Sequence, residues 1–341
     1  MRVAVVGATG AVGSTILGVM RERDFPAQEI VPFASERSAG RSIDYGDRDL
    51  AVTALSEEAI RGFDLALFSA GSAVSAEWAP RFADAGAVVV DNSSQWRTHE
   101  DVPLVVSEVN PEALEGHKGI VANPNCTTMQ TVIALGPILE AVGIERVVMS
   151  SYQAVSGTGQ RAVEELHRQA EAIIEAKELP APAVYPHQIA FNVLPQVETF
   201  KDGDDYTTEE RKCMRETSKI LGQDIGVSAT CARVPVFTGH SVSANVQTRE
   251  PLEPQGCRDL LSAAPGLVVI DDPANGLYPT ALDAAGRDDV LVGRIRRDPS
   301  HERCLNLWIV GNNLRKGAAT NAVQVAELLH VRGLLGAARA A

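Results

Sequence analysis

The chain has 341 residues and a formal net charge of −13, and this length suggests two domains or one large domain. A chain of this size buries about 75% of its unfolded surface and needs no disulfide bonds. The acidic balance argues against nucleic acid as the main partner. No apolar run approaches the roughly 18 residues of a membrane helix, and the first residues do not resemble a secretory signal. Five scattered cysteines without a C-x-x-C pair fit a reducing compartment, so we expect a cytoplasmic protein without a membrane partner.

The first half of the chain alternates short β-branched runs with helical patterns. Residues 2–7 (RVAVVG) are typical of a buried strand, and residues 11–24 predict the helix that follows it. Helical or loop segments separate most of the later strands. We expect these strands at residues 29–35, 65–70, 87–93, 104–109 and 119–124. Strands that alternate with helices predict a parallel, doubly wound sheet.

Glycines recur directly after the first expected strand. The run GATGAVG places Gly7, Gly10 and Gly13 between a strand and a helix, which is the context that a dinucleotide-binding loop requires. Glycines permit a tight turn and a close approach to a pyrophosphate, and the helix N-terminus offers it unpaired N–H groups. The spacing is GxxGxxG rather than GxGxxG, so a simple strand–helix turn is the alternative. We interpret the loop as the dinucleotide site of a Rossmann-type domain.

The segment ASERSAG, after the second expected strand, bears on which dinucleotide is bound. Ser35, Arg37 and Ser38 can together hold a 2′-phosphate by hydrogen bonds and charge. An NAD site usually has an acidic residue in this region, and Glu36 could contact a free ribose hydroxyl instead. We favour NADP over NAD as the cofactor.

A lone cysteine lies in the polar run NPNCTT, directly before an apolar stretch. A helix that starts at Cys126 would place the thiol beside unsatisfied N–H donors and the positive end of the helix dipole, which favour the thiolate. This position suits a nucleophile, and a buried structural cysteine is the alternative. The other four cysteines lie in strand-like or helical stretches and are interpreted as structural.

The pattern changes after Cys126 to longer strand-like runs with fewer helices between them. We expect these strands at residues 146–157, 187–197, 227–237, 240–248, 291–298 and 305–312. They predict an α+β domain with a mixed or antiparallel sheet. Residues 201–211 (KDGDDYTTEER) are interpreted as a solvated acidic loop. Residues 317–341 form a long helical pattern, which we expect to pack on the first domain.

A cysteine nucleophile needs an acid/base partner, and the chain offers seven histidines. His240 follows one strand-like run and begins another, so it lies at a turn between two elements. A histidine there can exchange protons near neutral pH, and His240 is our candidate.

The chain resembles one family along nearly its whole length. The motifs occur in the family's order: GATGAVG, ASERSAG, DNSSQWR, DVPLVVSEVN, NPNCTT, SYQAVSGTG, RETSKI, CARVPVFTGHS and NNLRKGAATNAVQVAE. Together they resemble the aspartate-semialdehyde dehydrogenases. The resemblance implies a Rossmann-type NADP-binding domain of residues 1–125 with 315–341, and an α+β catalytic and dimerisation domain with a mixed sheet, residues 126–314. It also implies a homodimer, or a tetramer built as two dimers, and we expect no metal site.

The resemblance implies a role for individual residues. Cys126 matches the nucleophile and His240 the acid/base group. Asn125 helps to place the reacting carbonyl, which the Gln153 amide orients, and Arg233 pairs with the substrate carboxylate. The other implied substrate contacts are Glu216 to the amino group, and Lys219 and Arg97 to the phosphate. The implied cofactor contacts are Thr9, Gly10, Ala11, Val12, Arg37, Ser38, Ser156, Gly157 and Asn313. Gly7, Gly13 and Ser35, from the glycine loop and the segment after the second strand, complete the candidate cofactor site.

The chemistry of the implied substrate, L-aspartyl 4-phosphate, agrees with these residue types. A planar guanidinium suits a carboxylate through a bidentate contact, a carboxylate suits the ammonium group, and two cations suit the phosphate. Glu216 and Lys219 are three residues apart and face the same way on a helix, although an ordinary exposed salt bridge is the alternative. The chain departs from the family at Asn312, where aspartate is frequent, and at Trp96, where another aromatic residue is common.

The implied reaction is the reversible, NADP-dependent reductive dephosphorylation of L-aspartyl 4-phosphate to L-aspartate 4-semialdehyde through a cysteine thioester, in lysine, threonine and methionine biosynthesis. Three alternatives stay open. N-acetylglutamyl-phosphate reductase shares the chemistry, but Glu216 suits a free ammonium group. Glyceraldehyde-3-phosphate dehydrogenase also has a cysteine followed by two threonines, but Gln153 and Arg233 do not fit it. A catalytically silent paralogue is disfavoured because Cys126 and His240 are both present.

Overall fold

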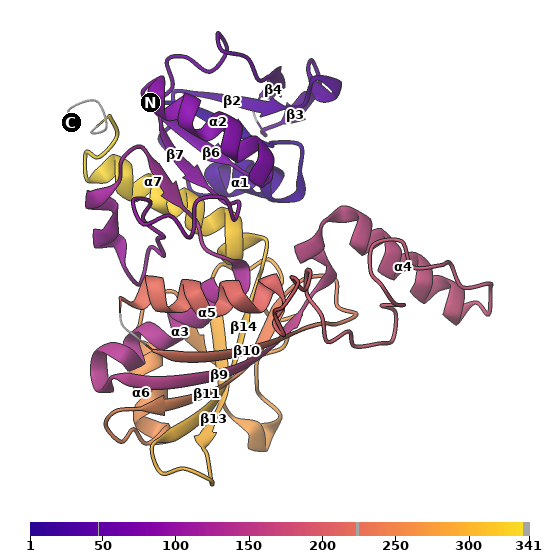
Figure 1. The fold of residues 1–341 in the computed structure, drawn as a ribbon, viewed down its shortest axis with the longest axis vertical. Coiled ribbons are helices and arrows are strands. Elements are labelled where there is room, and N and C mark those ends of the chain that lie inside the picture. Colours follow the sequence, from indigo (N-terminus) through magenta and orange to yellow (C-terminus); the bar gives the residue numbers. More distant parts are fainter. Residues whose placement is uncertain (47, 223–224, 337–341) are drawn as a thin grey trace. The chain divides into compact units, whose positions relative to one another are not determined.

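The computed structural model describes residues 1–46, 48–222 and 225–336, and the chain folds into two compact units (Figure 1). The first unit comprises Met1–Asn125 and the chain from Gly317 onward, and the second comprises Cys126–Lys316. Among the described residues, no helix is long and apolar enough to cross a membrane. The boundary between the units therefore falls at Cys126, the candidate nucleophile.

A parallel sheet forms the centre of the first unit, with the strand order β5-β2-β1-β6-β7-β8. Its central strands are buried along their length because helices cover both faces, as expected for a parallel sheet. The strands are β1 (Arg2–Val6), β2 (Glu29–Ala34), β5 (Thr53–Ala54), β6 (Leu65–Phe68), β7 (Val88–Asp91) and β8 (Ile120–Ala122). The unit also contains the hairpin strands β3 (Ser42–Asp44) and β4 (Asp49–Ala51), the helices α1 (Ala11–Glu22), α2 (Ser72–Asp84) and α7 (Asn321–Val331), and the short 3₁₀ helices η1 (Glu36–Ser38) and η2 (Pro111–Gly116). The predicted doubly wound sheet is confirmed.

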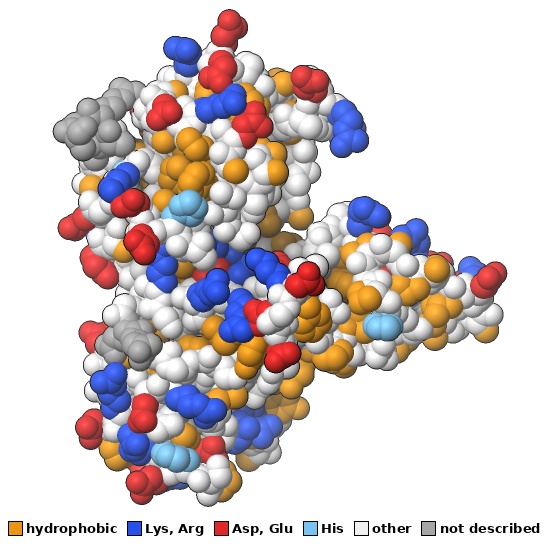
Figure 2. Space-filling model, viewed as in Figure 1, with side chains coloured by type: hydrophobic (Ala, Val, Ile, Leu, Met, Phe, Trp, Pro, Cys, Tyr) orange, Lys and Arg blue, Asp and Glu red, His pale blue; other side chains and the backbone are white. Residues whose placement is uncertain are grey.

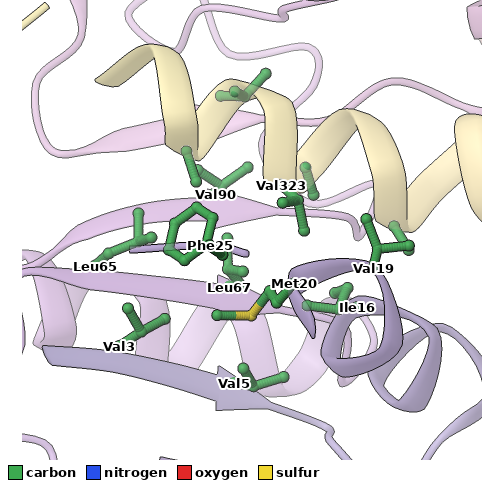
Figure 3. Close-up of a cluster of buried hydrophobic side chains, with 14 of the residues drawn as sticks. Val3, Val5, Ile16, Val19, Met20, Phe25, Leu65, Leu67, Val90 and Val323 are labelled. Carbon is green, nitrogen blue, oxygen red and sulfur yellow. The ribbon is translucent and has the colours of Figure 1, made fainter. Parts of the chain in front are cut away.

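Alternate residues of the central strands supply two separate hydrophobic cores. Val3 and Val5 of β1 face the core shared with α1 and α7, where Val323 of α7 lies beside side chains of α1 (Figure 3). On the other face, Phe82 of α2 packs against three further phenylalanines, with ring centroids 5.3 to 6.0 Å apart. Truncating such a ring to alanine costs about 3–5 kcal/mol, so this face anchors the sheet that carries the glycine loop.

Residues 104–109, which were expected to form a strand, make only one isolated bridge, from Leu104 to Ala122. The prediction is wrong because side chains take the backbone donors of this segment. The N–H of Val106 donates to the side-chain oxygen of Asn110, at 2.9 Å, and the N–H of Ser107 donates to that of Asn321, at 3.0 Å. Donors used in this way cannot extend a strand ladder.

The second unit contains a mixed sheet with the strand order β10-β9-β11-β14-β13-β12, as predicted. β9 runs parallel to β10 and antiparallel to β11, so the ends of these strands bring distant residues together. The strands are β9 (Ile144–Gln153), β10 (Gly226–Arg233), β11 (His240–Thr248), β12 (Leu267–Val269), β13 (Val290–Arg297) and β14 (Cys304–Gly311). The helices are α3 (Cys126–Val142), α4 (Gln160–Ile174), α5 (Thr208–Leu221) and α6 (Pro254–Ala263), with the shorter segments η3 (Val155–Thr158) and η4 (Pro273–Asn275). The π-helical η5 (Arg315–Thr320) begins in this unit and continues into the first unit from Gly317.

Two expectations for the second unit are wrong. Residues 187–197 form turns with one bridge, from Leu194 to Arg233, because the Gln169 side-chain oxygen accepts two of the segment's N–H groups. Residues 201–211 are not a loop throughout, since α5 begins inside them. A reciprocal capping box between Thr207 and Glu210 starts this helix.

The C-terminal helical pattern is divided between two kinds of helix. The π-helical turn Arg315–Thr320 precedes α7, which ends at Val331 and packs with α1 in the first unit. Gly333, with φ +67°, follows the end of α7. Residues 337–341 of the expected helix lie outside the described residues.

Candidate active site

The glycine loop of the first unit is shaped by two positions that admit no side chain. Gly7 has φ +86°, and a Cβ atom there would lie 2.3 Å from the carbonyl oxygen of Ser69. A Cβ atom on Gly13 would lie 2.1 Å from the carbonyl oxygen of Gly7. Gly10 is the N-cap of α1 without a side-chain capping bond. The exposed start of α1 is therefore open to an anionic group, and the residues suit a dinucleotide pyrophosphate.

The end of β2 is held beside this loop. The N–H groups of Gly7 and Ala8 donate to the carbonyl oxygen of Phe33, at 2.8 and 3.1 Å. Directly beyond β2, Ser35 and Arg37 are exposed at a short 3₁₀ helix. An exposed guanidinium and hydroxyl at this point can contact a ribose phosphate. The remaining candidates of the group are Thr9 and Ala11, which are exposed, and Val12 and Ser38, which are half-buried.

Arg97 and Asn125 belong to the first unit and are both buried. The Arg97 guanidinium donates from Nε to the carbonyl oxygen of Asn123, at 2.9 Å, and from Nη2 to that of Asn92, at 2.8 Å. Nearby, burial raises the pKa of Asp91, against the opposing effect of a hydrogen bond from Ser93 and of the Arg97 charge. Backbone carbonyls thus fix the orientation of the Arg97 cation.

Cys126 is the first residue of α3, as predicted from its polar–apolar boundary. It is partly exposed, whereas Thr127, Thr128 and Met129 after it are buried. The thiol therefore lies at an accessible helix N-terminus, the environment that favours a reactive thiolate. The other four cysteines, all within the described residues, are buried thiols.

His240, the first residue of β11, is fully buried. Its Nδ1 accepts a hydrogen bond from the N–H of Ala154, at 3.0 Å, so the neutral ring carries its proton on Nε2. Burial, and then the charge of Arg233, lowers the pKa of His240 well below its usual 6.5. Nε2 has no hydrogen-bond partner among the described residues. His240 therefore presents a neutral N–H donor that the protein leaves unused.

Gly157 leaves the space in front of that donor. A Cβ atom on Gly157 would lie 3.2 Å from His240 Nε2 and 3.2 Å from Nη1 of Arg233. These distances are tighter than ordinary van der Waals contact. Gly157 thus faces both candidate groups, and its lack of a side chain keeps them accessible to a bound molecule.

Arg233 ends β10 and is buried, with 4% of its surface exposed. Its Nη1 donates to the carbonyl oxygen of Ala154, at 2.7 Å, and its guanidinium carbon lies 5.9 Å from the centroid of the Tyr185 ring. Nε has no hydrogen-bond partner in the described part of the chain. A buried cation with an unused donor suits an anionic ligand such as a carboxylate.

Gln153 ends β9 and is the register partner of Arg233 on the neighbouring strand. The helix of Cys126 is tied to the same group, because Gln130, four residues after the cysteine, donates to the carbonyl oxygen of His240 at 3.2 Å. Hydrogen bonds and register thus connect Gln153, Arg233, His240 and the first turns of α3 within the second unit.

Glu216 and Lys219 lie on α5, which packs against β10. Glu216 is 2% exposed and Lys219 is half-buried. Burial of the carboxylate argues against the alternative of an ordinary exposed salt bridge. Charged side chains are seldom buried to this extent unless they are paired or bind a ligand.

Ser156 and Asn313 are both buried and joined by a hydrogen bond of 2.9 Å from Nδ2 of Asn313 to Oγ of Ser156. The side-chain oxygen of Asn313 also accepts from the N–H of Gly239, at 3.0 Å. Its neighbour Asn312 accepts from two following backbone N–H groups, each at 3.1 Å. An aspartate at position 312 would accept the same two bonds, but the asparagine amide also donates to the carbonyl oxygen of Ala284, at 3.3 Å, which an ionised aspartate cannot do.

Sequence reasoning missed two polar residues of this cluster, Glu209 and Gln130. Glu209 lies in the segment interpreted as a solvated loop, yet it is 3% exposed and binds Gln153. The Thr207-x-x-Glu210 capping box was the signal that a helix begins there. Among the described residues, no group of three or more His, Cys, Asp or Glu side chains could hold a metal ion.

Comparisons with known proteins agree with this arrangement. The semialdehyde dehydrogenase NAD binding domain family matches residues 2–117, and the semialdehyde dehydrogenase dimerisation domain family matches residues 135–316. The chain is 54% identical to the aspartate-semialdehyde dehydrogenase of Aquifex aeolicus, over 98% of this chain and 99% of that protein. It is 50% identical to that of Legionella pneumophila, over 98% and 97%.

Solved structures give the same result. The crystal structure of aspartate semialdehyde dehydrogenase II from Vibrio cholerae matches with a TM-score of 0.92 and 46% identity, over 97% of this chain and 98% of that chain. A structure of that enzyme complexed with ASA matches equally well, at 45% identity. The matches make this protein an oxidoreductase of amino-acid biosynthesis with a nicotinamide-nucleotide-binding domain. The chain belongs to the aspartate-semialdehyde dehydrogenase family.

Proposed function

We propose that the protein catalyses the reversible, NADP-dependent reductive dephosphorylation of L-aspartyl 4-phosphate to L-aspartate 4-semialdehyde, in lysine, threonine and methionine biosynthesis. The observation that carries this proposal is the group in the second unit. An accessible thiol at the start of α3 belongs to the same unit as a neutral buried histidine with an unused N–H donor and a buried arginine with an unused donor. These groups suit acyl transfer from a substrate that has a carboxylate.

In the proposed reaction, Cys126 is the nucleophile. Its thiolate attacks the acyl phosphate carbonyl, the carbon–oxygen bond to phosphate breaks, and inorganic phosphate leaves with the bonding electrons. A thioester on Cys126 remains. The helix N-terminus supports this role because its N–H groups stabilise negative charge on sulfur and on the adjacent oxygen.

His240 is the proposed acid/base group. When the carbonyl oxygen gains negative charge during reduction, the Nε2–H of His240 donates a hydrogen bond to that oxygen and stabilises the charge. The neutral ring, which the lowered pKa favours, can make this hydrogen bond, whereas transfer of the proton itself would require the imidazolium form. Collapse of the resulting thiohemiacetal releases the aldehyde and regenerates the Cys126 thiolate.

The remaining proposed contacts follow the charges of the substrate. Arg233 binds the carboxylate, Glu216 binds the amino group, and Lys219 and Arg97 bind the phosphate. Burial of Arg233 and Glu216 supports this assignment, because a desolvated charge gains most from a ligand of opposite sign. Asn125 is proposed to help place the reacting carbonyl.

The first unit is proposed to hold the cofactor. Gly7, Gly10 and Gly13 fit a pyrophosphate at the start of α1, and Arg37 with Ser35 and Ser38 fits the 2′-phosphate of NADP. Bound NADPH supplies hydride. Ser156, Gly157 and Asn313 are further proposed contacts, although Asn313 is already hydrogen-bonded within the second unit.

A homodimer, or a tetramer of two dimers, is proposed as the assembly. The match to a dimerisation domain family over residues 135–316 supports it. Exposed hydrophobic side chains of the second unit also support it, since Ile174 of α4 is 75% exposed and Phe191 is 66% exposed. Figure 2 shows hydrophobic side chains between charged ones over the arm that carries α4. Five cysteine thiols agree with the proposed cytoplasmic location.

The test is an assay in the oxidative direction. Purified protein is mixed with aspartate semialdehyde, inorganic phosphate and NADP, and the absorbance of the reduced cofactor is followed. Controls omit phosphate, replace NADP by NAD, or replace the aldehyde by N-acetylglutamate semialdehyde. Phosphate-dependent reduction with the aspartyl aldehyde is expected. Turnover only with the acetylated aldehyde would overturn the substrate, and absence of turnover with either would indicate a silent paralogue.

A further inference from the structure

Glu209 and Gln153 form a buried pair that the proposed reaction does not explain. Glu209 lies in the first turn of α5 and is 3% exposed, and Gln153 ends β9 and is 1% exposed. The amide nitrogen of Gln153 donates to Oε1 of Glu209 at 3.1 Å and to Oγ of Ser151 at 3.2 Å. Both hydrogens of the Gln153 amide group are therefore used inside the protein.

The carboxylate determines which way the amide faces. An ionised carboxylate only accepts hydrogen bonds, so the NH₂ group of Gln153 must point to Glu209 and its oxygen must point away. A neutral partner such as another amide would accept either orientation. The side chain of Gln153 can then meet a bound molecule only through Oε1, which is an acceptor.

Glu209 is itself held in position by a neighbouring cation, and the capping box of this helix is made by Thr207 and Glu210. Its Oε2 pairs with Nζ of Lys212 at 3.4 Å, and Lys212 also pairs with Glu198. Its neighbour Glu210 differs, because Glu210 accepts the backbone N–H groups of Thr207 and Cys231. Glu209 thus contacts the side chains of Gln153 and Lys212, which suits a residue that orients another side chain.

We propose that Glu209 is a positioning residue, which locks the Gln153 amide so that Gln153 presents its oxygen to the substrate as a hydrogen-bond acceptor. The substrate group that this oxygen recognises is a donor, and a protonated amino group is the chemical class that fits. This assignment revises the role expected for Gln153 as an amide that orients the carbonyl, since its donors are occupied. The part of the inference that concerns substrate rests on the proposed function.

The test exchanges the two side chains. Glu209→Gln lets the Gln153 amide take both orientations, so kcat/KM for aspartate semialdehyde should fall about tenfold, the value of one charge-assisted hydrogen bond. Gln153→Glu places two carboxylates together, so its kcat/KM should be lower than that of Glu209→Gln. The double variant Glu209→Gln with Gln153→Glu restores the hydrogen bond with donor and acceptor exchanged, and it still presents an acceptor at position 153. It should exceed Gln153→Glu by about tenfold.

Glu210→Gln is the matched control, because it removes a buried carboxylate from the same helical turn without touching Gln153. Its Tm should fall while kcat/KM stays within about twofold of the unchanged protein. A double exchange variant no better than Gln153→Glu would overturn the inference, since an amide donor would then be the group that matters. An equal loss in Glu210→Gln would also overturn it, because the effect would be general to the helix.

A second measurement does not depend on activity. The side-chain amide hydrogens of ¹⁵N-labelled Gln153 should exchange with water much more slowly than those of exposed glutamines, and Glu209→Gln should remove most of this protection. Protected hydrogens in a protein without the proposed activity would refute the function but still support the positioning of Gln153 by Glu209. Unprotected hydrogens in an active enzyme would refute the positioning role of Glu209 and leave the proposed function unaffected.

Discussion

The two units hold their candidate functional groups in different ways. In the first unit the backbone makes the site, because Gly7 requires a positive φ and Gly13 lies against the Gly7 carbonyl. In the second unit side chains from separate strands make it. His240 begins β11, and Gln153 and Arg233 end β9 and β10.

Because of this difference, substitutions in the two units should damage different properties of the protein. A change in the glycine loop should remove cofactor binding and stability together, because the loop and the core are the same backbone. A change in the strand-end cluster should remove chemistry and leave the fold in place, because its donors are left unused by the protein. The following substitutions test this separation.

Cys126→Ser should have the largest effect. Serine keeps the shape of the residue but loses the thiolate, so turnover should fall on the order of 10⁴-fold or more. NADP binding, measured by fluorescence titration, should stay unchanged. Full activity in this variant would refute the covalent mechanism, and loss of NADP binding would show that the two units are not separable in function.

Gly13→Ala should damage the first unit through its backbone. The added Cβ would lie 2.1 Å from the Gly7 carbonyl oxygen, so something must shift. We expect a loss of about 2–4 kcal/mol in the free energy of unfolding, with NADP affinity at least about a hundredfold lower. Gly18→Ala is the matched control on the same helix, since nothing lies within 4 Å of its Cβ, and it should stabilise the protein by about 0.5–1 kcal/mol.

Gly157→Ala should reduce activity strongly and stability only slightly, whereas Gly13→Ala should reduce stability strongly. Its Cβ would crowd His240 Nε2 and the Arg233 guanidinium at 3.2 Å, where a neighbour can move by a few tenths of an ångström. We expect kcat/KM to fall about thirtyfold while Tm changes by only a few degrees, since the strain is about 1–2 kcal/mol. A fall in Tm as large as that of Gly13→Ala would mean that both sites depend on backbone packing.

Arg233→Lys tests the carboxylate contact. Lysine keeps the charge but loses the planar pair of donors, so KM for aspartate semialdehyde should rise about tenfold with a smaller change in kcat. Steady-state kinetics separate the two parameters. An unchanged KM would show that Arg233 binds something other than the substrate carboxylate.

The same difference between the units explains what could be predicted from the sequence. The parallel sheet, the glycine loop and the helix start at Cys126 depend on patterns within a few residues, and each was predicted. Residues 104–109 and 187–197 have equally strand-like sequences, but distant side chains, Asn321 and Gln169, take their backbone donors. Local pattern contains no information about such partners.

The environment of the second site was hidden for the same reason. His240 was predicted as a candidate, but its tautomer and its unused Nε2 donor depend on Ala154, which lies on a different element. Glu209 was not predicted as a buried residue because the charge of its segment indicated a solvated loop, although the Thr207–Glu210 capping box indicates the start of a helix. The burial of a charged residue can be predicted only when the positions of its partners in the fold are known.

Two buried histidines, one in each unit, show how the same residue type can be structural in one place and available to a ligand in another. His117 in the first unit accepts from the N–H of Gly119 at Nδ1, at 3.1 Å, and its Nε2 meets the carbonyl oxygen of Leu334, at 3.2 Å. His240 has the same kind of bond at Nδ1 but no described partner at Nε2. Both pKa values are lowered by burial, and for His117 the Leu334 carbonyl opposes the shift. His117 is a satisfied structural residue, whereas the Nε2–H of His240 is available to a ligand.

The last prediction is a pH dependence of stability to which His240 contributes. Because its pKa is lowered in the folded state, the unfolded chain binds a proton that the folded protein does not. The stability is therefore fully present above the ordinary pKa of about 6.5 and declines as the pH falls below it, by up to about 1.4 kcal/mol per pH unit. Urea unfolding across this range should show a flatter profile in His240→Gln, and a smaller flattening in His117→Gln. Equal flattening in the two variants would mean that the unused donor of His240 does not distinguish its environment from that of a structural histidine.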